Sequence, residues 1–221
     1  MKRQQSGFTL VEIAIVLVIV GLLLGGVLKG QELINSAKAK SYAQDFRTIQ
    51  TALYGFQDRF KGIPGDLAGA DTKIIVGGVP ATLGMPVLTR GNGQINGNWD
   101  SAGLTDESCL AWQHMRMAGF LAGSTTVNCT TGDPYIQINA DGGRIGISST
   151  MQMTAPTAMT GSYNICSTGV LGKIAKQLDT QLDNGDPQTG SFRVATIAAP
   201  ATALVLASVD DATSYLVCLS F

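Results

Sequence analysis

The sequence is poor in histidine and in charged residues. His114 is the single histidine among 221 residues, and Asp, Glu, Lys and Arg together make up 14% of the chain. One histidine, together with the lack of any Cys-x-x-Cys pair, argues against a zinc site. No nucleophile motif accompanies His114, so we expect it to be a packed or surface residue. The sequence therefore predicts a protein without enzymatic chemistry of its own.

Clusters of basic residues are also lacking. Lys and Arg number 15 against 16 Asp and Glu, which gives a formal net charge of −1, and the basic residues are scattered. Nucleic acids and anionic surfaces attract concentrated positive charge. We therefore predict no nucleic-acid partner.

Proline is absent between Phe8 and Ile63. An uninterrupted helix over residues 8–60 would be about 80 Å long. Its first part, residues 8–28, is almost purely apolar and would span about 31 Å, close to the hydrocarbon thickness of a bilayer. Lys2 and Arg3 precede it, and the positive-inside rule keeps them cytoplasmic. The sequence thus predicts one membrane pass.

The second part of this helix, residues 29–61, is amphipathic. Its large apolar residues recur at steps of three and four, which is a helical period. They are Tyr42, Phe46, Ile49, Leu53, Phe56 and Phe60. We expect this stripe to pack against a sheet, and we expect Gly62-Ile63-Pro64-Gly65-Asp66 to end the helix.

Glu12 is the one charged residue between positions 8 and 28. A carboxylate in lipid costs several kcal/mol or more unless it is paired. No basic residue lies within the segment, so we expect its partner to come from another molecule. A cleaved secretory signal is one alternative, but its apolar region is usually shorter and its cleavage site follows closely. An ordinary signal anchor fits the length but gives Glu12 no role.

Gly7-Phe8-Thr9-Leu10-Val11-Glu12, behind a basic leader and ahead of an apolar run, resembles the signal of type IV pilins and type II secretion pseudopilins. The resemblance implies cleavage by a prepilin peptidase between Gly7 and Phe8, with residues 1–7 as leader, and N-methylation of Phe8. It also implies an inner-membrane assembly platform and self-assembly into a helical filament. There Glu12 would neutralise the Phe8 amine of a neighbouring subunit.

Residues 62–221 are expected to form an extracytoplasmic globular domain, so that the whole is an α+β, pilin-like fold with an antiparallel sheet. Alternation and capping patterns predict its elements. They are a helix over 106–120, a hairpin of 135–138 with 144–147, a helix capped by Ser167 or Thr168 and running to Leu182, and a final hairpin of 203–208 with 215–219.

Four cysteines allow three disulfide pairings. In an oxidising compartment, two disulfides are the natural use of four cysteines. From their order in the chain we favour Cys109–Cys129 and Cys166–Cys218.

Asp179, Asp183 and Asp186 follow one another at the end of the predicted helix. Their carboxylates are candidate calcium ligands, as in some pseudopilins, whereas the alternative is a solvated turn. No other cofactor is predicted.

These patterns favour a structural subunit of a type IV pilus or a pilus-like filament. The alternatives are a type II secretion pseudopilin, a minor pilin acting as an adhesin or DNA-uptake module, and a membrane-anchored enzyme. The expected location is the inner membrane, with the globular domain outside the cytoplasm, and after assembly a filament at the cell surface or across the periplasm.

Overall fold

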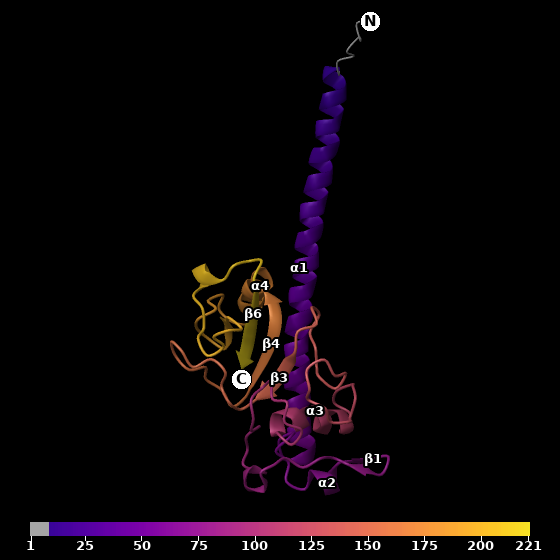
Figure 1. Cartoon of the computed structure of the whole chain (residues 1–221), viewed down its shortest axis with the longest axis vertical. Coiled ribbons are helices and arrows are strands. Elements are labelled where there is room, and N and C mark those ends of the chain that lie inside the picture. Colours follow the sequence, from indigo (N-terminus) through magenta and orange to yellow (C-terminus); the bar gives the residue numbers. More distant parts are fainter. Residues whose placement is uncertain (1–8) are drawn as a thin grey trace, which may run out of the picture. The chain divides into compact units, whose positions relative to one another are not determined.

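The computed structural model describes residues 9–221 and divides the chain into two compact units. One reaches to Ala37 and the other runs from Lys38 to Phe221. A single helix, α1 (Leu10–Phe60), contributes residues to both (Figure 1). The long apolar helix and the antiparallel sheet that follows confirm the predicted α+β, pilin-like fold class.

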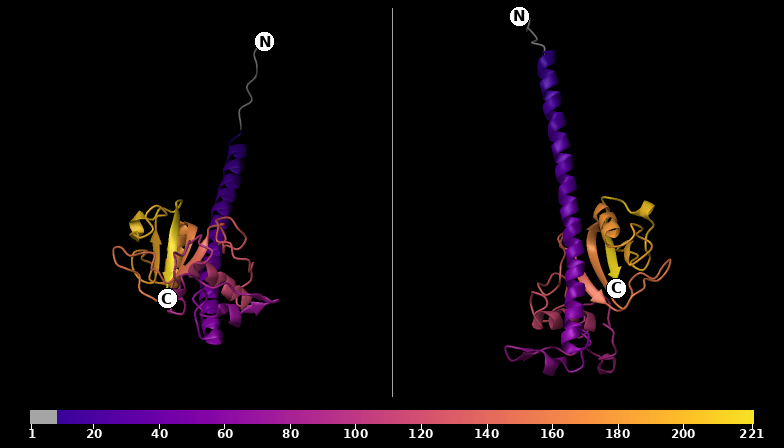
Figure 2. Two further views of the ribbon diagram at one scale, coloured as in Figure 1. Left: turned by 60° about the horizontal axis from the view of Figure 1, so that its bottom comes forward. Right: turned by 180° about the vertical axis from the view of Figure 1, so that it is seen from behind.

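The second unit is built around residues of α1 from Ala39 onward. The stripe of Tyr42, Phe46, Ile49, Leu53 and Phe56 is buried in the main hydrophobic core. The Phe46 ring meets the ring of Phe192 edge-on at 6.3 Å, so this half of the helix packs against the sheet (Figure 2). The structure confirms the sequence prediction for this stripe.

The sheet has four antiparallel strands in the order β3-β4-β6-β5. Their bounds are β3 (Ile145–Ser148), β4 (Asn164–Leu171), β5 (Phe192–Ala195) and β6 (Ser214–Ser220). The helix α4 (Gly172–Leu182) follows β4 directly. Because β4 and β6 are central, nearly all of their residues are buried or half-buried.

The predicted start of the helix that ends at Leu182 needs correction. Ser167 and Thr168 do not cap a helix, because they lie inside β4, and α4 begins only at Gly172. Ser167 pairs with Ile145 on one side and Val217 on the other. Pairing on both sides outweighs the local capping preference of serine and threonine.

The two predicted hairpins are also wrong in part. Of residues 135–138, Ile138 pairs with Arg144 in an isolated antiparallel bridge, and the Gln137 carbonyl accepts the Ile145 N–H at 2.7 Å, so this end of the predicted hairpin is present. Tyr135 and Ile136 lie in a turn instead, where the Tyr135 N–H donates to Asp133 Oδ1 at 2.8 Å and the Ile136 N–H to the Asp133 carbonyl at 3.0 Å. Residues 203–208 contribute one bridge and the short 3-10 helix η2 (Leu206–Ser208). The partners of β3 and β6 are instead found on β4 and β5.

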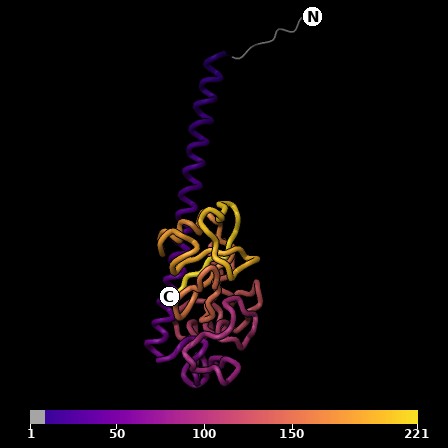
Figure 3. The backbone as a smooth tube through the Cα atoms, turned by 90° about the vertical axis from the view of Figure 1, so that its left-hand side faces the viewer, coloured from indigo at the N-terminus to yellow at the C-terminus, as the bar shows by residue number. Residues whose placement is uncertain are grey.

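Long loops join these elements, as the backbone trace in Figure 3 shows. The region after α1 contains α2 (Ala70–Lys73), the small hairpin of β1 (Ile75–Val76) and β2 (Val79–Pro80), and the 3-10 helix η1 (Val87–Thr89). The helix α3 (Glu107–Met117) follows, close to its predicted bounds.

The corner that ends α1 is held by buried contacts. Gly65 has φ +86, and a Cβ placed there would lie 2.2 Å from the Glu107 carbonyl oxygen, so only glycine fits. Its N–H donates to His114 Nδ1 at 2.9 Å. The next residue, Asp66, accepts backbone N–H groups from Gly91, Asn92 and Gly93. The corner thereby fixes the long loop that precedes α3.

Two disulfides close the second unit. Cys109 on α3 pairs with Cys129, and Cys166 on β4 pairs with Cys218 on β6, directly opposite in the strand register. All four residues are at most 1% exposed. This is the pairing favoured from the order of the cysteines in the sequence.

Candidate functional site

The apolar half of α1 is the candidate functional element. Its large side chains from Leu10 to Leu28 are all exposed, among them Leu17 at 66% and Leu22 at 73%. The segment is long and apolar enough to cross a membrane, with a mean hydropathy of 2.8 over 18 residues. Apolar surface on this scale marks contact with lipid or with other protein.

Glu12 is hydrogen-bonded at the start of this helix. Its Oε2 accepts the Thr9 N–H and the Thr9 hydroxyl, each at 2.8 Å, and its own N–H donates to Thr9 Oγ1 at 3.2 Å. This reciprocal arrangement is a capping box, with Thr9 as N-cap and Glu12 three residues later. The carboxylate also lies at the positive end of the helix dipole, which favours its charge.

The capping box changes the expectation that the partner of Glu12 comes only from another molecule. Thr9 supplies hydrogen bonds but no positive charge, so the carboxylate keeps its net charge. The signal was present in the sequence, since Thr9-Leu10-Val11-Glu12 matches the pattern S/T-x-x-E. The assembly role of Glu12 stays a prediction. Gly7 and Phe8, the expected cleavage and methylation positions, lie outside the described residues.

The three candidate calcium ligands lie at the end of α4, each with hydrogen bonds of its own. Asp179 accepts the Gly185 N–H at 3.1 Å, Asp183 accepts the Phe192 N–H at 3.0 Å, and Asp186 accepts the Gln188 N–H at 3.2 Å. Within residues 9–221 no group of three His, Cys, Asp or Glu side chains is arranged to hold a metal. Calcium binding stays a prediction.

Asp179 nevertheless differs from its neighbours. It is fully buried, and its Oδ2 has no hydrogen-bond partner among the described residues. The pKa of Asp179 is raised to about 6, mainly by burial, while the Gly185 N–H opposes the shift and the charges of Asp183 and Asp186 act in the same direction as burial. In this environment the Asp179 carboxyl group is partly protonated near neutral pH.

His114 is a structural residue of the core. Nδ1 accepts the Gly65 N–H, so Nε2 carries the proton and donates to the Thr82 carbonyl at 2.8 Å. The ring stacks on Phe56, and burial lowers the pKa of His114 to about 4. A neutral imidazole that joins two loops to α3 fits the packed histidine expected from the sequence.

Comparison with known proteins bears on the N-terminal segment. A family model described as the prokaryotic N-terminal methylation motif matches residues 2–28. No curated protein and no solved structure matches the chain. The matched residues contain the hexapeptide, Glu12 and the whole apolar run. The chain therefore carries the prepilin-type N-terminal signal of type IV pilins and pseudopilins.

Proposed function

We propose that this protein is a structural subunit of a type IV pilus or a pilus-like filament, cleaved by a prepilin peptidase between Gly7 and Phe8 and methylated at Phe8. The observation that carries the proposal is the match to the methylation motif over an apolar helix whose side chains are exposed. The role is structural rather than catalytic. The apolar helix first anchors the subunit in the inner membrane and then enters the filament core.

Glu12 has two successive partners in this proposal. In the single subunit, Thr9 holds the carboxylate through two hydrogen bonds. Cleavage creates a new α-amine at Phe8, and in the filament the carboxylate of one subunit neutralises the amine of the next. An ion pair in an apolar core contributes little stability relative to apolar packing, but breaking it is costly, so it selects one register.

The orientation in the membrane follows from charge. Lys2 and Arg3 stay in the cytoplasm, and the unit from Lys38 to Phe221 lies outside it. The two disulfides support this placement, because such bonds persist in oxidising compartments. Protease added to spheroplasts should digest this unit, and resistance would reverse the proposed topology.

The first test is the intact mass and N-terminal sequence of the protein from its native membrane. A mature start at Phe8 carrying one added methyl group is the expected result. An unprocessed start at Met1 would contradict the proposal.

The second test compares Glu12→Gln with Glu32→Gln, which removes the same charge just beyond the apolar run. Glu12→Gln should lower the filament yield at least tenfold while membrane insertion stays normal. Glu32 forms an exposed pair with Lys29, so its variant should assemble normally. Normal filament yield from Glu12→Gln would overturn the pairing.

A type II secretion pseudopilin carries the same signal, so it is the second candidate. The two roles separate in a deletion strain. Loss of surface filaments with normal protein secretion indicates a pilus subunit, whereas loss of secretion indicates a pseudopilin.

A further inference from the structure

Two segments of the second unit expose most of its large apolar side chains. The first, named the hairpin end, comprises the exposed residues of β1, β2 and the loop up to η1, which are Ile75, Val76, Val79, Met85, Val87 and Leu88. The second, named the loop end, comprises Ile197, Val205 and Leu206. No charged residue lies within 74–89 or 194–209. Exposed apolar surface of this kind marks a site of contact with another molecule.

The hairpin end and the loop end lie at opposite ends of the second unit. β1 follows α2 shortly after α1 stops, and the Gly91 N–H, just beyond η1, donates to the Asp66 carbonyl at 2.8 Å, so the hairpin end stays close to the corner that ends α1. The loop that contains η2, in yellow, lies at the other end of this unit in each overall view (Figure 1, Figure 2 and Figure 3). Neither surface can therefore cover the other within one copy.

Surfaces at opposite ends of one molecule can meet only between different copies. Such a contact is heterologous, because one copy contributes its hairpin end and the next contributes its loop end. Heterologous contacts that do not close into a ring generate open fibres, which is the kind of assembly proposed for this chain. Contact between two like ends would instead stop at a dimer.

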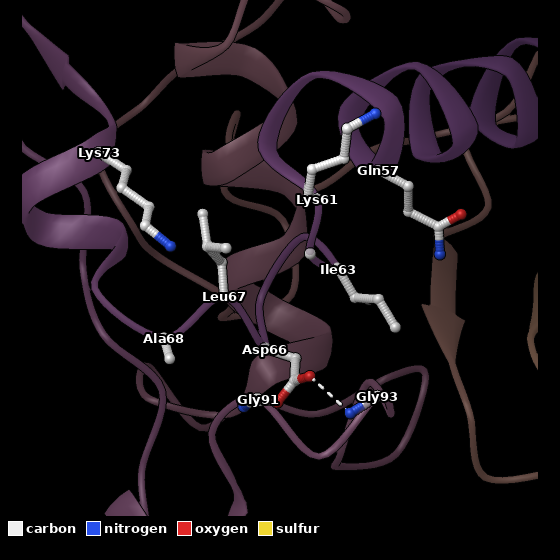
Figure 4. A pocket seen from close by; sticks show the side chains of 10 residues that line it. Gln57, Lys61, Ile63, Asp66, Leu67, Ala68, Lys73, Gly91 and Gly93 are labelled. Carbon is white, nitrogen blue, oxygen red and sulfur yellow. Dashed lines mark hydrogen bonds between the residues drawn. The ribbon is translucent and has the colours of Figure 1, made fainter.

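The charged residues that border the two surfaces differ in sign. Lys73 directly precedes the hairpin end, is exposed and forms no ion pair within residues 9–221. The carboxylate of Asp66, at the same corner, is occupied by backbone N–H groups of a neighbouring loop (Figure 4). Asp210 and Asp211 follow the loop end, and Lys176 pairs with Asp211 alone. Opposite charge at the borders favours contact of unlike ends over contact of like ends.

We propose that the hairpin end of one copy docks on the loop end of the next copy, so that the second units join end to end along the filament. The apolar half of α1 carries assembly, and this contact adds burial of apolar surface between the second units. The inference rests on the proposed filament function, because the filament is what aligns successive copies.

Cross-linking of intact filaments tests the contact. All four natural cysteines are in disulfides, so introduced cysteines supply the free thiols. Leu206→Cys combined with Val79→Cys or with Leu88→Cys should give a ladder of multimers with a short bis-maleimide, whereas each single variant should stay monomeric. Filaments without a ladder from either double variant would overturn the docking and leave the filament proposal standing. Dimers from a single variant would also overturn it, because like ends would then meet.

Substitution gives a second test. Val79→Asp and Leu88→Asp change side chains that are 62% and 96% exposed, so folding and N-terminal processing should stay normal while filament yield falls at least tenfold. Leu104→Asp is the matched control, since Leu104 is 52% exposed and belongs to neither surface, and it should assemble normally. Normal yield from both variants, or an equal loss in the control, would overturn the docking.

The same thiols distinguish a second copy from lipid as the partner of the loop end. In membranes of a strain that lacks the assembly platform, a water-soluble maleimide should label Leu206→Cys fully, and assembly into filaments should protect it at least fivefold. Protection already in those membranes would assign the loop end to lipid and overturn the proposal. An unmodified protein that forms no filaments would overturn the filament function, and this contact with it.

Discussion

Helix α1 presents two different surfaces along one continuous element. Between Leu10 and Leu28 its large apolar side chains are exposed, whereas from Tyr42 to Phe56 the large apolar residues of the core stripe are at most 3% exposed. The backbone conformation is the same in both. What differs is whether the chain itself covers the apolar surface, and this difference separates a segment built for other molecules from a segment built for folding.

The most direct way to sharpen this contrast is to remove one large side chain from each half. Phe46→Ala empties a fully buried site and should lower the free energy of unfolding by about 4 kcal/mol. Leu17→Ala removes a side chain that is 66% exposed and should change it by less than about 0.5 kcal/mol. Urea unfolding of the full chain in micelles measures both. Similar effects would contradict the division.

The disulfides should affect only the second unit. Loop-closure entropy assigns about 4 kcal/mol to Cys166–Cys218, with a sequence separation of 52, and about 3 kcal/mol to Cys109–Cys129, with a separation of 20. Paired alanine variants should lower the unfolding free energy in that order. Circular dichroism should show that the apolar helix persists after the second unit unfolds. Loss of this helix together with the second unit would contradict the division of α1 into two parts.

Acid should likewise act on the second unit, through His114. Its pKa is about 4 in the folded state against 6.5 in the unfolded state, because the ring is buried. The unfolded chain binds the proton more readily than the folded chain. The contribution of His114 to the free energy of unfolding is therefore fully present above pH 6.5 and falls by about 3 kcal/mol as the pH approaches 4. Unfolding curves at pH 7 and 5, with an NMR titration of the ring, measure this. A ring that titrates near 6.5 would contradict it.

Asp179 provides a control, because its effect on the pH dependence of stability is opposite to that of His114. Burial raises its pKa from 3.8 to about 6, so its contribution to stability is present below pH 3.8 and is lost as the pH rises through 6. Asp179→Asn removes that opposing slope. The variant should therefore lose stability more steeply than the parent protein on acidification below pH 6.

The smallest expected effect concerns the first residues of the second unit. Asp141 accepts hydrogen bonds from Lys38 and from the Tyr42 hydroxyl, the latter at 2.8 Å. Asp141→Asn keeps the shape but removes the charge, and because the pair is partly exposed the cost should be about 1 kcal/mol. Thermal unfolding of Asp141→Asn and of Asp211→Asn, whose pair with Lys176 is more exposed, gives the measurement and its control.

The sequence predicted those features whose cause lies in local pattern. Periodicity located the aromatic stripe of α1, and the hexapeptide with its apolar run located the prepilin-type signal. Prediction from the sequence failed where contacts with distant segments determine the local structure. Ser167 is a strand residue because two other strands flank it, and Tyr135 lies in a turn because its N–H donates to Asp133. The hydrogen bonds of Asp66 could not be predicted, because their donors lie on the distant loop of residues 91–93.

The corner at Gly65 and Asp66 has a consequence for recognising related chains. Position 65 tolerates no Cβ, and the Asp66 carboxylate accepts three backbone N–H groups with both of its oxygens, which the amide of an asparagine could not do because its nitrogen is a donor. The aromatic stripe, in contrast, can exchange one large apolar residue for another at modest cost. A search profile for distant relatives should therefore weight the Gly-Asp pair after the helix above the more interchangeable residues of the core.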